Sequence, residues 1–206
     1  MKKQIPVFLV IIVIAVVLSI FYRDKEPPLP KLPKDLKRLI ISSPPITLPK
    51  FTLVDENHKP FTNNNLMGKW SMLFFGYTNC PDVCPTTMAV MNQVSQLADT
   101  PKDTQYVFIS VDPKRDTPDH LKQFTTYFNP AFMGVTGKRK ELDKFRDPIG
   151  AIYSYEGDTN SDNYVVNHFS GIYFIDPKGR ERAYVLPPHS KTILSKAYQL
   201  IRKYYD

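Results

Sequence analysis

Apolar and polar positions over residues 51–206 follow two patterns, one typical of buried strands and one typical of amphipathic helices. Continuous apolar runs predict strands within a sheet, and apolar residues three or four positions apart predict helices that cover it. The predicted strands are residues 71–77, 106–111 and 131–136, with hairpins at 51–62 and 171–186. The predicted helices contain residues 90–98, 118–128 and 138–146, and a last one begins at Ser190. This order predicts one α/β domain with a mixed central sheet, flanked by helices and with binding groups at the strand ends.

The amino-terminal segment has a different pattern, because residues 5–22 form an uncharged and almost wholly apolar run between charged residues. As a helix rising about 1.5 Å per residue, this run would approach the thickness of a hydrocarbon core of about 30 Å. No small-residue cleavage site follows it, so a cleaved signal peptide is the weaker interpretation. We therefore predict one transmembrane helix, an uncleaved anchor, within residues 1–23.

The position of this run also predicts the location of the domain. A very short tail precedes it and a large domain follows, so export of the carboxyl-terminal part is the expected orientation. This predicts a single-pass protein of the cell inner membrane with its soluble domain on the extracytoplasmic, periplasmic side. Seven prolines between residues 27 and 49 predict a stiff tether over residues 24–50. The domain itself is expected at residues 51–206.

Composition excludes several classes of protein. With 42% apolar and 13% aromatic residues, the 206-residue chain has enough bulk for a packed core, which argues against disorder. The net charge of +7 is not gathered into a basic run, so a solvated surface is favoured over a nucleic-acid groove. Because the chain has only 2 cysteines, neither a multi-disulfide scaffold nor a four-cysteine zinc site can form.

These two cysteines, Cys80 and Cys84, directly follow the buried strand 71–77. Proline disfavours helix in the residue before it, so Pro85 predicts that Cys84 is the cap of a helix and that residues 80–84 form a loop. The amino end of a helix stabilises thiolate, which is both a nucleophile and a metal ligand. The spacing therefore favours a reactive site over an inert pair or a structural disulfide.

Two thiolates in one loop can converge on a soft metal ion, and imidazole is the plausible third ligand. The candidates are His58 in a hairpin turn, His120 on a polar helix face, His189 beside a helix start, and His168. His168 comes just before the predicted strand 171–175, where the end of a sheet could face the cysteine loop. A set of two Cys and one His suits Cu(I), whereas zinc would need water as a further ligand.

Four motifs make the sequence recognisable, and in chain order they are Phe75-Gly-Tyr-Thr-Asn-Cys-Pro-Asp-Val-Cys-Pro85, Val111-Asp-Pro-Lys-Arg-Asp-Thr-Pro118, Gly134-Val-Thr-Gly137 and Tyr164-Val-Val-Asn-His168. Together they resemble the Sco/SenC family of membrane-tethered copper proteins. The resemblance implies a thioredoxin-like fold, copper held by Cys80, Cys84 and His168, and a role in maturing the CuA centre of cytochrome c oxidase. The family usually has Asp-His-Ser where this chain has Asn167, His168 and Phe169, which could alter how the imidazole is oriented.

Two functions remain open. The first is a copper metallochaperone, whose partners would be a copper donor, a thiol reductant and the oxidase subunit that carries the CuA site. The second is a thiol-disulfide oxidoreductase that reduces the cysteines of the oxidase copper site. It would use Cys80 and Cys84 as a redox-active dithiol, which would form a disulfide bond in an oxidising compartment. A peroxide-reducing enzyme is a weaker third interpretation, because the chain lacks a Pro-x-x-x-Thr-x-x-Cys pattern. None of these functions involves nucleic acid.

Charged residues after the strand 106–111 allow two interpretations. Asp112, Arg115 and Asp116 precede a predicted helix that has Thr117 as its cap, so they could simply form the turn. Alternatively, they form a charged rim near the metal loop, where Asp112 or Asp116 contacts a partner. Phe75 and Tyr77 are expected in the core.

Overall fold

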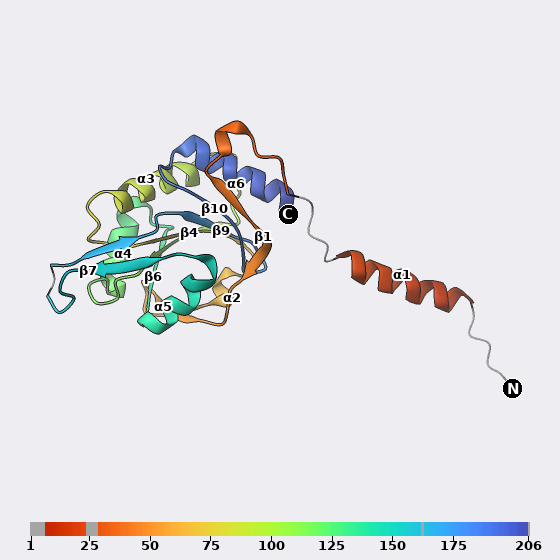
Figure 1. The fold of residues 1–206 in the computed structure, drawn as a ribbon, viewed down its shortest axis with the longest axis horizontal. Helices are drawn as coiled ribbons and strands as arrows, with labels where there is room; N and C mark the ends of the chain where they lie inside the picture. The colour runs from red at the N-terminus through yellow and green to blue at the C-terminus, as the bar shows by residue number, and fades with distance from the viewer. Residues whose placement is uncertain (1–6, 24–28, 162, 206) are drawn as a thin grey trace. The chain divides into compact units, whose positions relative to one another are not determined.

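The computed structural model of the chain describes residues 7–23, 29–161 and 163–205. The chain divides into two compact units, Met1–Pro30 and Lys31–Asp206. The first unit contains helix α1 (Val7–Arg23), and the second contains all other helices and strands that the structure describes (Figure 1).

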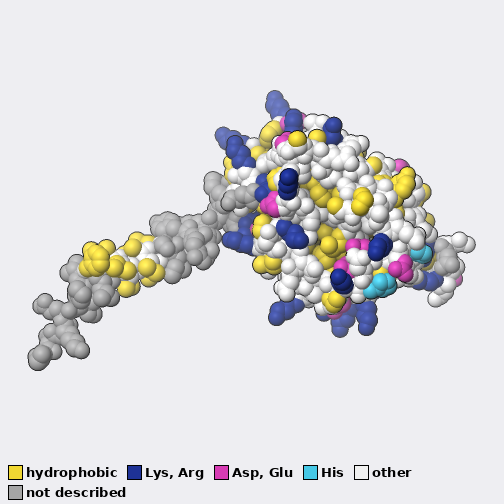
Figure 2. All heavy atoms as spheres, turned by 180° about the vertical axis from the view of Figure 1, so that it is seen from behind, with side chains coloured by type: hydrophobic (Ala, Val, Ile, Leu, Met, Phe, Trp, Pro, Cys, Tyr) yellow, Lys and Arg dark blue, Asp and Glu magenta, His cyan; other side chains and the backbone are white. Residues whose placement is uncertain are grey.

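Helix α1 is apolar over its 17 residues. Its described side chains include a run of exposed aliphatic residues (Figure 2). Within the described part of the chain, no helix combines the length and the apolar character that a membrane span requires. The predicted transmembrane helix is therefore not found, and residues 1–6 of the predicted 1–23 segment lie outside the described residues.

The structure also differs from the tether predicted over residues 24–50. Within that range, Lys34–Leu36 form the 3-10 helix η1, and Leu39–Thr47 form strand β1 at the edge of the main sheet. β1 pairs with β10 (Arg180–Val185), and its register shifts between Ile41 and Ile46, where two prolines interrupt the ladder. Prolines are tolerated there because an edge strand needs hydrogen bonds on one side only.

The main sheet has eight strands in the order β1-β10-β9-β4-β5-β6-β2-β3. Strands β4 (Trp70–Gly76), β5 (Thr104–Ser110) and β6 (Met133–Thr136) are parallel, and the remaining pairs are antiparallel. The other strands of the sheet are β2 (Thr52–Asp55), β3 (Pro60–Thr62) and β9 (Ile172–Ile175). The mixed central sheet predicted from the sequence is therefore confirmed.

Helices cover both faces of this sheet (Figure 1). Helices α3 (Val83–Ser95), α4 (Pro118–Phe128) and α6 (Lys191–Tyr205) pack on one face, and α5 (Arg139–Arg146) packs on the other, where α2 (Asn63–Leu66) and the 3-10 helix η2 (Asp147–Ile149) also lie. Strand β4 joins the two layers, because Met72 and Phe74 belong to the first core while Leu73 and Phe75 belong to the second. This alternation follows from the two-residue period of a strand.

A second, smaller sheet was not anticipated from the sequence. Strands β7 (Tyr153–Glu156) and β8 (Val165–His168) form a two-stranded antiparallel ribbon, which we call the β7–β8 ribbon. It has few strongly apolar positions, so its pattern gives only a weak strand signal. The buried residues Tyr164 and Val166 join the second core, and His168 is the last residue of the ribbon.

The basic excess of the chain is dispersed on the face that Figure 2 shows. Lysine and arginine side chains are spread around this face and alternate with acidic ones, rather than gathering into one patch (Figure 2). On this face the arrangement agrees with the solvated surface expected from the sequence.

Candidate metal centre

The buried cysteine of the pair, Cys84, lies in the first turn of α3. The helix begins at Val83, with Asp82 as its N-cap, so the prediction that Cys84 is the cap was wrong. Pro85 falls in the same turn, where a missing N–H removes no intrahelical hydrogen bond. Cys84 is fully buried, and it fits because a Cβ on Gly76 would lie only 2.6 Å from its Sγ. Because Gly76, the last residue of β4, has no side chain, the Cys84 thiol can pack directly against it.

The second cysteine, Cys80, lies in the loop just before α3 and is only half-buried. Hydrogen bonding by the Cys84 thiol lowers the pKa of Cys80 to about 3, against the opposing effect of burial; His168 and nearby backbone groups act in the same direction as Cys84. The same pairing and its own burial raise the pKa of Cys84. The centre therefore contains one half-exposed thiolate beside one buried thiol, and both cysteines are free.

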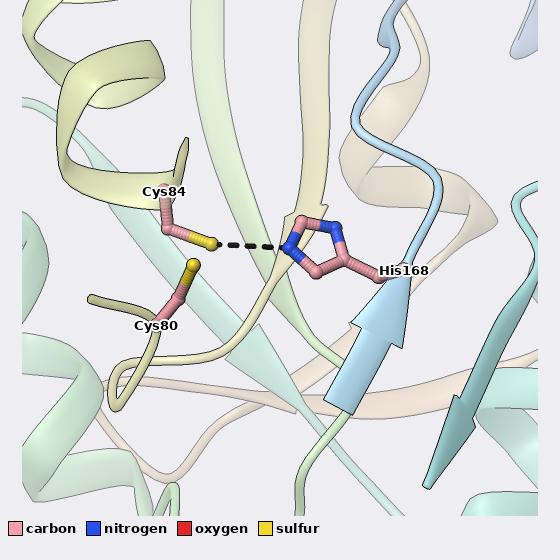
Figure 3. Close-up of side chains that lie close together, drawn as sticks. All are labelled: Cys80, Cys84 and His168. Atoms are coloured by element: carbon pink, nitrogen blue, oxygen red, sulfur yellow. Dashed lines mark hydrogen bonds between the residues drawn. The ribbon is translucent and has the colours of Figure 1, made fainter. Parts of the chain in front are cut away.

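His168 completes the group from the other side (Figure 3). Its ring points from the end of β8 toward both sulfur atoms, and Nε2 lies 3.4 Å from Cys84 Sγ. The ligand atoms of Cys80, Cys84 and His168 all lie within 4.8 Å of one another. The ring is held edge-on by Phe74 and Tyr77, at centroid distances of 6.0 and 5.9 Å. The geometry thus brings together the three residues that the sequence singled out.

The second ring nitrogen of His168 has an unusual environment. Nδ1 is buried and has no hydrogen-bond partner among the described residues, although the second nitrogen of a metal-ligating histidine normally donates to an oxygen. Asn167 does not fill this role, because its side chain donates to Glu156 at 3.1 Å. Phe169 packs against Tyr173, with ring centroids 6.1 Å apart. Ring packing rather than a hydrogen bond from Nδ1 therefore orients the imidazole.

The donor set fits a soft metal ion. Two sulfur ligands and one imidazole nitrogen, with no carboxylate among them, match the preference of Cu(I). A hollow of about 240 Å³ opens beside Cys80 and His168, lined also by Tyr77, Val83 and Val165. Cys80 is reached from this hollow, while Cys84 stays covered.

The other three histidines lie in different surroundings. His58 faces Asp119 at 3.1 Å, and His120 contacts the carbonyl oxygen of Arg115 at 3.0 Å. His189 contacts Thr87 and a backbone carbonyl, and burial lowers its pKa. None of them belongs to the three-ligand group found among the described residues.

The charged residues after β5 do not form the surface rim that the sequence allowed. Asp112 and Asp116 are fully buried. Asp116 accepts hydrogen bonds from Ser110 and Thr78, and Asp112 pairs with Arg115. Because the carboxylates are engaged in internal contacts, neither is available to a partner. Phe75 and Tyr77 are buried, as expected.

Sequence reasoning missed the residues that surround the ligands. Tyr77 lines the hollow and packs on His168, yet it was assigned only to the core. Tyr164 anchors the β7–β8 ribbon through its contacts with Asp112 and Arg115. The signal that could have found it is its place four residues before His168, in the motif Tyr164-Val-Val-Asn-His168.

The low pKa of Cys80 predicts a distinctive alkylation profile. With a pKa of about 3, Cys80 stays thiolate from about pH 5 to 8, so its rate with iodoacetamide should be nearly constant over this range. An ordinary thiol, with a pKa of about 8.5, would react about tenfold faster for each pH unit. Mass spectrometry of quenched samples of the reduced native chain measures this rate, with the urea-unfolded chain as control. A tenfold rise per unit in the native chain would contradict the prediction.

Comparisons with known proteins identify relatives of this chain. A sequence model of the SCO1/SenC family matches residues 42–203. The SCO2-like protein of Rickettsia conorii is 38% identical over 132 residues, which cover 63% of this chain and 64% of that protein. The human protein named SCO1 homolog, mitochondrial, is 34% identical over 152 residues, covering 72% of this chain and 50% of that protein. The chain thus spans less than two thirds of the length of these two relatives.

A solved structure of a related protein has a similar fold. The crystal structure of Arabidopsis thaliana ScoI, solved with copper bound, matches with a TM-score of 0.66 and 31% sequence identity. The match covers 76% of this chain and 98% of that one. The thioredoxin-like fold implied by the sequence resemblance is therefore confirmed.

Proposed function

Because this chain belongs to the SCO1/SenC family, we propose that it is a metallochaperone that binds copper as cargo through Cys80, Cys84 and His168. It would deliver this copper to the CuA centre of cytochrome c oxidase during assembly. The observation that carries the proposal is the convergence of two sulfur atoms and one imidazole nitrogen within 4.8 Å. The copper-bound structure of a related ScoI protein supports it.

The three ligands would have different roles in the transfer of copper. Cys80 is the half-exposed thiolate beside the hollow, so an acceptor's thiol can approach copper at this ligand first. Cys84 and His168 hold the cargo from the buried side. Stepwise exchange of soft ligands keeps Cu(I) coordinated throughout the transfer. The partners are then a copper donor, the oxidase subunit that carries the CuA site, and a thiol reductant that keeps the pair reduced.

The location is part of the same proposal. In this proposal the domain lies on the periplasmic side of the cell inner membrane, the side to which the sequence predicts its export. The apolar run at residues 5–22 supports attachment there.

One observation favours a second candidate, a thiol-disulfide oxidoreductase. A thiolate of low pKa at Cys80, next to the buried Cys84 thiol, is the arrangement that disulfide exchange requires. Cys80 would attack a partner disulfide to form a mixed disulfide, and Cys84 would then displace the partner. The partner gains two thiols, the Cys80–Cys84 pair becomes a disulfide, and a thiol reductant restores it.

Replacing His168 separates the two functions. In cells, His168→Ala should lower cytochrome c oxidase activity if copper delivery is the function, because the cargo loses one of its three proposed ligands although the two thiolates still bind Cu(I). Thiol exchange needs only the two cysteines, so it predicts near-normal oxidase activity. His58→Ala is the matched control, since His58 lies outside the ligand group and faces Asp119. Oxidase activity near normal in the His168 variant would overturn the metallochaperone proposal and favour the second candidate.

A further inference from the structure

The two halves of the metal centre come from two different sheets. Cys80 and Cys84 follow β4 of the main sheet, whereas His168 ends the β7–β8 ribbon. Among the described strands, the ribbon pairs with no strand of the main sheet. Backbone ladders therefore do not fix the distance between the cysteines and the histidine. Other contacts must hold the ribbon in place.

Helix α5 and the second core supply some of these contacts, through the two tyrosines of β7. The loop that follows β5, residues 111–116, supplies contacts to the ribbon's turn and to the start of β8, and we call it the anchor loop. Its Lys114 reaches the turn that joins β7 to β8. Lys114 Nζ donates to the carbonyl oxygens of Thr159, Asn160 and Ser161, at 3.0, 3.2 and 2.9 Å. Three carbonyl oxygens match the three N–H donors of an ammonium group, so this lysine holds the turn between β7 and β8 in place.

Arg115 holds the strand that carries the histidine. Its Nη1 donates to the carbonyl oxygen of Tyr164, at 3.0 Å, and its guanidinium carbon lies 3.7 Å from the centroid of the Tyr164 ring. The Tyr164 hydroxyl in turn donates to Asp112 at 2.5 Å. Tyr164 immediately precedes β8, so this contact fixes the start of the strand that ends at His168. A flat guanidinium stacked on a ring restrains orientation as well as distance.

The same loop also holds the cysteine half of the centre. Asp116 accepts hydrogen bonds from the backbone N–H and the hydroxyl of Thr78, at 2.9 and 2.5 Å. Thr78 lies two residues before Cys80. The Arg115 guanidinium also lies 5.6 Å from the ring of Tyr77, which packs on His168. One short loop therefore contacts the segments that carry both kinds of ligand.

We propose that the anchor loop sets the position of His168 relative to the two cysteines, with Lys114 and Arg115 as positioning residues. This inference rests on the proposed copper function. Neither residue is part of the ligand group, so each acts through the ribbon. If the ribbon loosens, the imidazole leaves the sulfur atoms while the Cys80–Cys84 pair stays in place on α3 and its preceding loop.

The expected consequence depends on the oxidation state of copper. Two thiolates bind Cu(I) well without help, whereas imidazole contributes more to the harder Cu(II) ion. Displacing His168 should therefore weaken Cu(II) binding much more than Cu(I) binding. A variant that merely destabilised the whole domain would weaken both alike.

The test uses the full chain carrying Lys114→Met or Arg115→Lys, the latter keeping the positive charge beside Asp112. Each variant should lower Cu(II) affinity about tenfold, as loss of an outer contact to a metal site does, and change Cu(I) affinity less than about twofold. The Cu(II) electron paramagnetic resonance spectrum should lose its nitrogen coupling. Lys114→Arg, which keeps cationic N–H donors but in a planar group, should give values between those of Lys114→Met and the parent. Lys122→Met is the matched control, because Lys122 is an exposed lysine that donates to Asn57 rather than to the ribbon.

A second measurement needs no copper. Hydrogen exchange of the metal-free chain should speed up at the amides of β8 in both positioning variants, and remain unchanged in β4. If Cu(II) and Cu(I) affinities fall together, or if β8 exchange and Cu(II) affinity both match the parent, the anchor loop does not position His168. A parent chain that binds no copper would instead overturn the proposed function, and the exchange experiment would still decide the inference about the loop.

Discussion

Replacing either Cys80 or Cys84 by serine should lower the affinity of the full chain for Cu(I) by at least about a thousandfold, because one thiolate and one imidazole form a much weaker soft-ligand set than two thiolates do. The parent should bind one equivalent, since its three ligand atoms form a single group. Competition with a chromophoric Cu(I) chelator under reducing conditions measures the affinity. The effect should be similar for both cysteines, although only Cys80 is accessible in the native structure.

Two further variants serve as comparisons for the loss of Cu(I) affinity in the cysteine variants. Thr86→Ser is the control, because Thr86 is exposed on the same helix and belongs to no ligand group among the described residues. His168→Ala should reduce Cu(I) affinity less than either cysteine variant does. If one serine variant retained parent affinity, the two-thiolate site would be refuted, and with it the copper proposal. Oxidising the pair to a disulfide should have the same effect as losing both thiolates.

The second large effect concerns Glu181, a buried carboxyl group outside the metal centre. It is fully buried on β10, and neither of its carboxyl oxygens has a hydrogen-bond partner among the described residues. Burial raises its pKa to about 7, against smaller opposing effects of the Arg182 guanidinium and of the Ser42 hydroxyl, which lies near the carboxyl group without forming a well-aligned hydrogen bond to it. Burial likewise raises the pKa of Tyr173, whose hydroxyl also has no partner among the described residues. The folded protein therefore prefers the protonated acid at position 181.

This preference makes the free energy of unfolding depend on pH. The stabilisation from the proton is fully present below the ordinary glutamate pKa of about 4.5 and is lost as pH rises through about 7. A difference of that size corresponds to about 3 kcal/mol. Glu181→Gln keeps the neutral form at every pH, so the variant should match the parent at about pH 4.5 and be about 3 kcal/mol more stable at about pH 8.5. Urea unfolding, followed by fluorescence of the single, buried Trp70, measures both.

The comparison between variant and parent cancels the contributions of all other titrating groups. Glu156→Gln is the control, because Glu156 is exposed on the β7–β8 ribbon and its neutralisation should leave the difference near zero at both pH values. If the stability gain of Glu181→Gln were equal at the acidic and the alkaline pH, the raised pKa of Glu181 would be refuted.

The sequence determined much of the domain because its signals are local. The continuous apolar run at residues 71–77 identified the central strand β4, and Thr117 with Pro118 identified the start of α4. These patterns depend only on the periods of strands and helices and on the chemistry of caps. Cys80 and Cys84 could be paired for the same reason, since a short loop brings them together whatever the rest of the fold does.

The local signals failed where distant contacts outweigh them. Pro85 predicted that Cys84 caps the helix. In the structure the helix begins at Val83 instead, and the Cys84 side chain is buried against Gly76. The prolines before residue 50 predicted a tether, but pairing with β10 turns Leu39–Thr47 into an edge strand. In both places, tertiary packing and pairing decided a conformation that the local sequence disfavoured.

Only the tertiary structure decided how the histidine meets the cysteines. Sequence spacing left four histidines as candidates, and His168 was preferred firmly only through family resemblance. The structure places its Nε2 3.4 Å from Cys84 Sγ, across 84 residues of chain. It does so through a ribbon held by Lys114 and Arg115, contacts whose partners lie 45 to 49 residues away. Contacts between residues so far apart in the chain produce no hydrophobic period that a single sequence could show. They form only when the whole domain has folded and has brought the two segments together.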